Sequence, residues 1–205
     1  MALANYSDLQ TSIANWMHRS DLTTVIPDFI TLAEKRINGD LDARVQDTIA
    51  ILTTVPSTAT TSIPADVINI RSLTLQSSPN VVLNYLTPDQ FNYQYKFSTS
   101  GVPASFSVIG SLIYYGPTPD SAYPVQCVYK AMLSTLTALN PTNVILTGYP
   151  QVYLNAARIE AAKYLAWPED KIAELERNYA EAIKSVNSTD WYSGSTLRVR
   201  QDVRM

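Results

Sequence analysis

The side chains that could support covalent or metal chemistry in this chain are few and scattered. The sequence has one histidine, His18, and one cysteine, Cys127, so neither a histidine metal cluster nor an internal disulfide can form. His18 falls near a predicted helix end, and Cys127 falls in a predicted strand, where a small buried hydrophobic role is expected. Asp66 and Asp120 fall in turns, where aspartate favours local backbone bonds.

Sequence motifs add no catalytic centre to this picture. The chain has no phosphate-binding glycine motif, no nucleophile elbow and no zinc-protease helix motif. We therefore expect no enzyme activity, no catalytic residues, no metal and no cofactor.

Composition excludes several classes of protein. The chain has 205 residues, a formal net charge of −3 and 46% hydrophobic residues, which is typical of a folded domain rather than a disordered chain. The acidic balance gives no basic field that would attract nucleic acid. No basic and apolar leader opens the sequence, and no apolar run is long enough to span a membrane. A soluble protein of the cytoplasm, with no membrane partner, is expected.

Charge is unevenly distributed and predicts the domain organisation. Residues 46–148 carry only seven charged side chains, whereas the segments before and after carry the remaining 26 of the chain's 33. The charge-poor middle is rich in Thr, Ser, Val, Ile and Tyr, which favour strands. We predict an α+β fold in which residues 1–45 and 146–192 form a four-helix base, and residues 46–145 form an inserted antiparallel β sandwich or barrel.

Helix signals define the base. Ser7 and Gln10 fit a capping box that begins a helix running to about Arg19. Pro27 fits the first position of a second helix, with a stop near residues 38–39. Apolar spacing predicts two further helices, over 149–166 and from there to about residue 190, separated by the break at 167–168.

Turn chemistry divides the insert into short strands. The predicted strands cover 48–55, 67–76, 81–85, 105–109, 112–115 and 125–132. Gly110-Ser111 suits a tight hairpin. Thr87 and Gln90 form a second capping box, which predicts a short helix between strands.

Two sets of residues are candidate contact sites. The tail over residues 193–205 alternates apolar and basic side chains after a Ser-Gly-Ser hinge, so it reads as an extended arm that a partner could pair with; a bland solvated tail is the alternative. The insert is rich in tyrosine, which suits an interface, although strand filling or a carbohydrate-binding face would also account for it. The candidate residues of the arm are Trp191, Tyr192, Leu197, Arg198, Val199, Arg200, Val203 and Arg204, and those of the insert are Tyr93, Tyr95, Tyr114, Tyr115 and Tyr123.

Several motifs recur together along the chain in a distinctive order. They are Tyr6-Ser7-Asp8-Leu9, the run from Ile26 to Asn38, Ile63-Pro64-Ala65-Asp66-Val67, Tyr85-Leu86-Thr87-Pro88-Asp89-Gln90-Phe91, Asn140-Pro141-Thr142-Asn143 with Tyr149-Pro150 and Tyr153, and Leu197-Arg198-Val199-Arg200. In this order and spacing, the sequence resembles the head-to-tail adaptor proteins of short-tailed bacteriophages.

The resemblance implies a structural protein of the virion neck, assembled in the host cytoplasm. It implies a twelve-fold homo-oligomeric ring between the portal protein and the tail nozzle or tail tube protein, through which genomic DNA passes without sequence-specific binding. On this basis the arm is expected to contact the portal, and the insert tyrosines the nozzle or a neighbouring subunit. A stand-alone β-domain binding module, for a glycan or a protein, is the alternative function.

Overall fold

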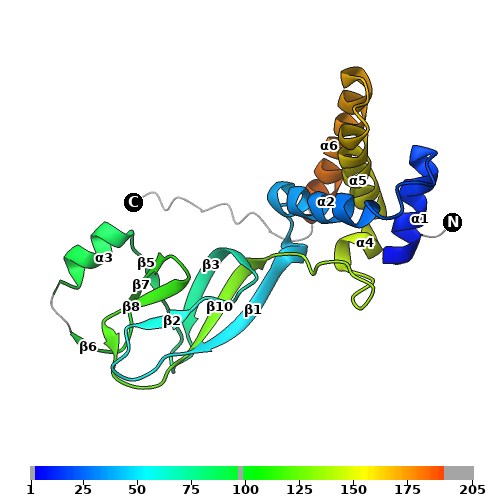
Figure 1. The fold of residues 1–205 in the computed structure, drawn as a ribbon. Coiled ribbons are helices and arrows are strands. Elements are labelled where there is room, and N and C mark those ends of the chain that lie inside the picture. Colours follow the sequence, from blue (N-terminus) through cyan, green and yellow to red (C-terminus); the bar gives the residue numbers. More distant parts are fainter. Residues whose placement is uncertain (1–2, 97–98, 192–205) are drawn as a thin grey trace, which may run out of the picture. The chain divides into compact units, whose positions relative to one another are not determined.

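The chain folds into two units, each with its own hydrophobic core (Figure 1). The computed structural model describes residues 3–96 and 99–191. A helical unit takes in the residues up to Val45 and from Leu133 onward, and a β unit takes in Gln46–Met132. The predicted α+β class is confirmed.

The helical unit packs around its central helix, α5. Its elements are α1 (Tyr6–Met17), α2 (Ile26–Asp40), the short α4 (Val144–Gly148), α5 (Pro150–Tyr164) and α6 (Glu169–Trp191). Buried alanines such as Ala156, Ala157 and Ala161 let neighbouring helices approach α5 closely. The stripe predicted for α6 is also buried, from Leu175 to Val186, so the last two helices form a hairpin on the same core (Figure 1).

Two helix boundaries differ from the sequence prediction. The N-cap of α1 is Asn5, whose side chain accepts a hydrogen bond from the Asp8 amide, so the prediction of a Ser7 cap is wrong. Asn is as good a cap as Ser, and local pattern alone does not rank the two. α2 continues through Gly39 to Asp40, because packing of Ile37 in the core outweighs the weak helix propensity of Asn-Gly.

Residues 133–145 belong to the helical unit, and their predicted place in the insert is wrong. Leu133 and Leu136 are buried in the helical core. The Leu136 amide donates to Glu34 Oε1 at 2.7 Å, and the Leu133 amide donates to Asn38 Oδ1 at 2.8 Å. The part of the segment before α4 has no regular structure, so these two backbone amides are satisfied by side chains of α2 instead.

The β unit is built from two four-stranded sheets. One has the order β1 (Asp47–Thr53), β10 (Pro124–Ala131), β3 (Val67–Leu75), β4 (Val81–Val82) and pairs in antiparallel fashion. The other has the order β2 (Thr60–Ser62), β8 (Leu112–Gly116), β7 (Ser105–Ile109), β5 (Asn84–Tyr85), and its β5–β7 pair is parallel. A small parallel pair joins β6 (Ser100–Gly101) to β9 (Thr118–Pro119).

Both sheets contribute to one core, as a sandwich requires. Leu73 and Cys127 come from the first sheet and Phe106, Ile113 and Tyr115 from the second. The turn at Gly110 joins β7 to β8 with a φ of 61°, which is the left-handed conformation that a tight hairpin needs and glycine supplies.

The short helix predicted in the insert is α3 (Pro88–Gln94). Both halves of its capping box form, because the Thr87 side chain accepts from the Gln90 amide while the Gln90 side chain accepts from the Thr87 amide. The remaining helical turn, η1 (Arg44–Gln46), leads into β1.

Candidate interaction surfaces

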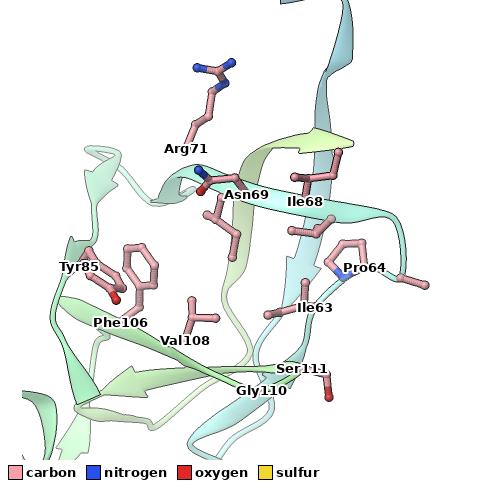
Figure 2. A pocket seen from close by; sticks show the side chains of 13 residues that line it. Ile63, Pro64, Ile68, Asn69, Arg71, Tyr85, Phe106, Val108, Gly110 and Ser111 are labelled. Carbon is pink, nitrogen blue, oxygen red and sulfur yellow. The ribbon is translucent and has the colours of Figure 1, made fainter. Parts of the chain in front are cut away.

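The β unit contains a cavity of about 720 Å³ that opens between its two sheets (Figure 2). Its lining is mainly apolar. The side chains of Ile63, Ile68, Ile70, Tyr85, Phe106 and Val108 line it. Asn69, Arg71 and Ser111 add polar groups at its edge, and Figure 2 shows Asn69 and Ile68 on β3 opposite Val108 on β7. An apolar lining of this kind suits a side chain or strand better than a charged ligand.

The cavity exists because neither sheet is completed along this side. β4 pairs only with Thr74 and Leu75 of β3, and β5 pairs only with Ser105 and Phe106 of β7. Among the described residues, the stretch of β3 from Val67 to Ile70 therefore has no strand on the side away from β10. The backbone groups on that side of a strand are available to an added strand.

The opposite edge of the first sheet is formed by β1. Its only strand neighbour within the described chain is β10. Ile49 is 59% exposed and Ile51 is 54% exposed, and both lie on the outer face, because the alternating Ala50 and Leu52 pack on the core. Sequence analysis missed this surface, since the apolar run over 48–55 does not tell which of its residues face outward.

The candidate tyrosines of the insert differ in accessibility. Tyr93 on α3 is 87% exposed. Tyr95, Tyr114 and Tyr123 are half-buried. The rings of Tyr95 and Tyr114 both pack against Phe91, with centroids 5.0 and 6.4 Å apart. These residues sit on or beside α3 and β8, apart from Tyr123, whose hydroxyl donates to Asp120 Oδ1 at 2.6 Å.

Tyr115 does not reach a surface of the β unit. It is 1% exposed and belongs to the sandwich core, and burial raises the pKa of its hydroxyl to about 12. Its predicted contact role is corrected to core packing. In β8 the buried and half-buried faces alternate, so neighbouring tyrosines must point to opposite sides.

The candidate residues of the arm lie at the end of the described chain or beyond it. Trp191 is the last residue of α6. The other arm residues, from Tyr192 to Arg204, lie outside the described residues.

The side chains that could have supported covalent or metal chemistry have structural roles. His18 caps α1 in a left-handed conformation with a φ of 53°, and its backbone amide bonds Ala14 and Asn15. Cys127 is buried, and burial raises the pKa of its thiol to about 11. The Tyr129 hydroxyl donates to the carboxylate of Asp66. Within the described ranges, no group of three His, Cys, Asp or Glu side chains could hold a metal.

The helical unit presents an aromatic–cation pair that the sequence did not reveal. The Arg158 guanidinium lies 4.6 Å from the centroid of the Trp16 ring, and Trp16 is 54% exposed. Burial lowers the pKa of Arg158. Tryptophan and arginine are enriched among the residues that carry most of the binding energy of protein interfaces, so the pair between α1 and α5 is a candidate contact point. The spacing of 142 positions between them hides it from sequence patterns.

None of the described helices is long and apolar enough to cross a membrane. A comparison with curated proteins returns no match. The model of one protein family, described as SU10 adaptor protein, matches residues 4–200, and so spans both units. This family is structural, and the apolar cavity, the open strand edges and the exposed aromatic side chains suit a protein that works through contacts. The chain therefore belongs to the SU10 adaptor protein family and is a bacteriophage adaptor protein.

Proposed function

We propose that this adaptor forms a ring in the virion neck, between the portal protein and the tail nozzle or tail tube protein. In this position it lines the channel for genomic DNA and seals the neck. The observation that carries the proposal is the family match over nearly the whole chain. The twelve-fold symmetry of the ring, and the portal and nozzle as its partners, are what the resemblance to head-to-tail adaptors implies.

A ring built by repeating one contact needs two different complementary surfaces on each subunit. The chain offers such surfaces on both units. The β unit has the open edges of β1 and β3, and the helical unit has the exposed Trp16 beside Arg158. Exposed large apolar side chains at an open strand edge, such as Ile49 and Ile51, are of the kind that mark interaction sites, which supports a role in assembly.

The helical unit and the β unit contact different partners in the neck. The helices and the arm over residues 193–205 dock on the portal, and the β insert docks on the nozzle or a neighbouring subunit through Tyr93, Tyr95, Tyr114 and Tyr123. Tyr93 is the best placed of these, because it is the most exposed. The net charge of −3 supports passage of DNA without tight binding, since tight non-specific binding needs many cationic contacts with phosphates.

Mixing the protein with its portal tests the proposal. We expect a defined complex of much larger size, measured by analytical ultracentrifugation and electron microscopy. Deletion of residues 197–205 should leave the folded units intact and abolish the complex. A truncated protein that still co-sediments with the portal would contradict the role of the arm.

Failure of the intact protein to join the portal would contradict the ring itself and favour the stand-alone binding module. Tyr93→Ala should retain portal binding and weaken attachment of the nozzle, with Leu139→Ala, at an even more exposed residue of the helical unit, as the matched control. Equal nozzle attachment by the two variants would contradict the contact through α3.

A further inference from the structure

We propose that β1 of one subunit pairs with the open edge of β3 in the next subunit, so that the first sheets of neighbouring β units join into a continuous inter-subunit sheet. This inference rests on the proposed ring and specifies the contact between its subunits. The occupant of the cavity beside β3 is thus a second copy of this chain.

The two edges match in strand direction. β1 and β3 are both antiparallel to β10, so they are parallel to each other and lie on opposite sides of the same strand. A neighbour in a ring is related by a rotation that brings one side of a subunit against the other side of the next. Its β1 would then run parallel to β3, which is a standard strand pairing.

The edges also match in side-chain character. The residues of β1 that face inward, Ala50 and Leu52, already pack on the core of their own unit. In the paired strand they would also face the opening of the neighbouring cavity, where Ile63, Ile70 and Val108 provide an apolar lining. Pairing would place apolar side chains against apolar side chains and fill a cavity that is otherwise open to water.

Charge complementarity favours the same arrangement. The only charged residue of β1 is Asp47, and the only charged residue of β3 is Arg71. Within one subunit, Arg71 Nε donates to Asp47 Oδ1 at 2.6 Å across β10. In the joined sheet each Arg71 would lie between the Asp47 of its own chain and that of the neighbour, and a guanidinium has donors on several sides.

β1 lacks the features that keep an edge strand from pairing with another chain, which favours a protein partner over solvent along this edge. Natural edge strands are usually guarded by lysines, prolines, bulges or short length. β1 spans Asp47–Thr53, contains neither lysine nor proline, and pairs with β10 in a regular register. Exposed isoleucines at positions 49 and 51 make this edge prone to pairing with another strand.

A disulfide experiment tests the pairing directly. Ile49 and Ser72 both pair with Val128, so they lie at the same level on β1 and β3. In one chain the intervening β10 separates them by about 9–10 Å, two strand spacings, which a disulfide cannot bridge. In a joined sheet that keeps this level they become neighbours, just beyond the open stretch from Val67 to Ile70. Oxidation of Ile49→Cys/Ser72→Cys in assembled rings should therefore give a ladder of covalent multimers on a non-reducing gel.

The controls separate this inference from the proposed ring. Each single-cysteine variant should give no ladder, because the native Cys127 is buried. Ile49→Cys/Asn69→Cys and Ile51→Cys/Ser72→Cys sample neighbouring registers, so a ladder with any of the three pairs supports the joined sheet. Rings that form on the portal but give no ladder with any pair would overturn the inference and leave the proposed function standing. If the wild-type protein forms no rings on the portal, both the joined sheet and the proposed ring are overturned.

A charge introduced at the edge provides a second measurement. Ile51→Lys should lower the extent of ring assembly about tenfold, because lysine on an edge strand opposes pairing. Val102→Lys is the matched control, since Val102 is 51% exposed in the same unit and lies on neither edge. Equal assembly by the two folded variants would overturn the inference.

Discussion

Replacing Glu34 by leucine should destabilise the helical unit more than any substitution of an exposed acid. Glu34 is 5% exposed on α2. Its Oε1 accepts from the Leu136 amide at 2.7 Å and from the Tyr153 hydroxyl at 3.5 Å. The carboxylate thus fixes the segment after Leu133 to the helices. Leucine has similar volume but no acceptor, so the Leu136 amide would remain buried without a partner, and the Tyr153 hydroxyl would keep only the hydrogen bond that it accepts from Asn143 Nδ2.

The size of the effect follows from these two bonds. A buried donor left without its acceptor costs about 1–3 kcal/mol. Leucine removes two acceptor contacts but also removes a costly buried carboxylate, so we expect a net loss of about 2–4 kcal/mol in the free energy of unfolding. Glu34→Gln keeps a carbonyl oxygen for the Leu136 amide and should cost less than about 1 kcal/mol.

Urea unfolding followed by tryptophan fluorescence measures this change in the helical unit alone. All three tryptophans, Trp16, Trp167 and Trp191, lie outside Gln46–Met132. Glu176→Leu is the control, because Glu176 pairs with Lys163 at the surface with a side chain 47% exposed, and exposed pairs contribute about 0–1 kcal/mol. An equal unfolding midpoint for Glu34→Leu and Glu176→Leu would refute the role assigned to Glu34.

The pH dependence gives an independent check of its burial. Burial raises the pKa of Glu34 above its ordinary value of 4.5. The stabilising contribution of the protonated acid is complete below that value and is lost as the pH rises through the raised pKa. Glu34→Gln cannot ionise, so its stability relative to the wild type should improve as the pH rises from acid towards neutral. The opposite trend would show that hydrogen bonds to the carboxylate outweigh its burial.

Three further outcomes are expected. In Gly116→Ala the added Cβ would lie 2.6 Å from Cζ of Tyr95, so the ring must move and the thermal midpoint of the β unit should fall by an amount equivalent to about 1–3 kcal/mol. Thr87→Ala removes the N-cap of α3 and should increase amide hydrogen exchange there by an amount equivalent to about 1 kcal/mol. Cys127, with its pKa raised to about 11 by burial, should react with a disulfide reagent at pH 8 about 100-fold more slowly than in urea; rapid labelling of the folded protein would contradict this burial.

Periodic patterns predicted the elements that depend on local chemistry. The buried stripe of α6, the Gly110-Ser111 hairpin and the capping box at Thr87 all follow from neighbouring residues, and all three form. The run over 81–85 was predicted as a single strand, but the structure divides it between β4 and β5 in different sheets. Strand propensity marks extended backbone but does not specify the partner.

The features that sequence reasoning missed depend on contacts between distant residues. The placement of residues 133–145 depends on Glu34 and Asn38, about a hundred positions away. The burial of Tyr115 depends on which face of β8 turns inward, and the exposed edge of β1 depends on the strand order. Such facts become available only when the register is known, because a shift of one residue exchanges the two faces of a strand.

The helical unit has a closed core, whereas the β unit has open strand edges. In the helical unit the irregular segment after Leu133 is anchored by buried side chains, and the core is closed by α5. In the β unit each sheet ends on one side in a strand, β4 or β5, that covers only two residues of its neighbour, whereas the longer edge strand β1 exposes isoleucines. A lysine, a proline, a bulge or a shorter strand would be the usual protection of an edge such as β1 in a monomer. Because β1 lacks this protection along its whole length, its edge is the part of the adaptor that we expect assembly to complete.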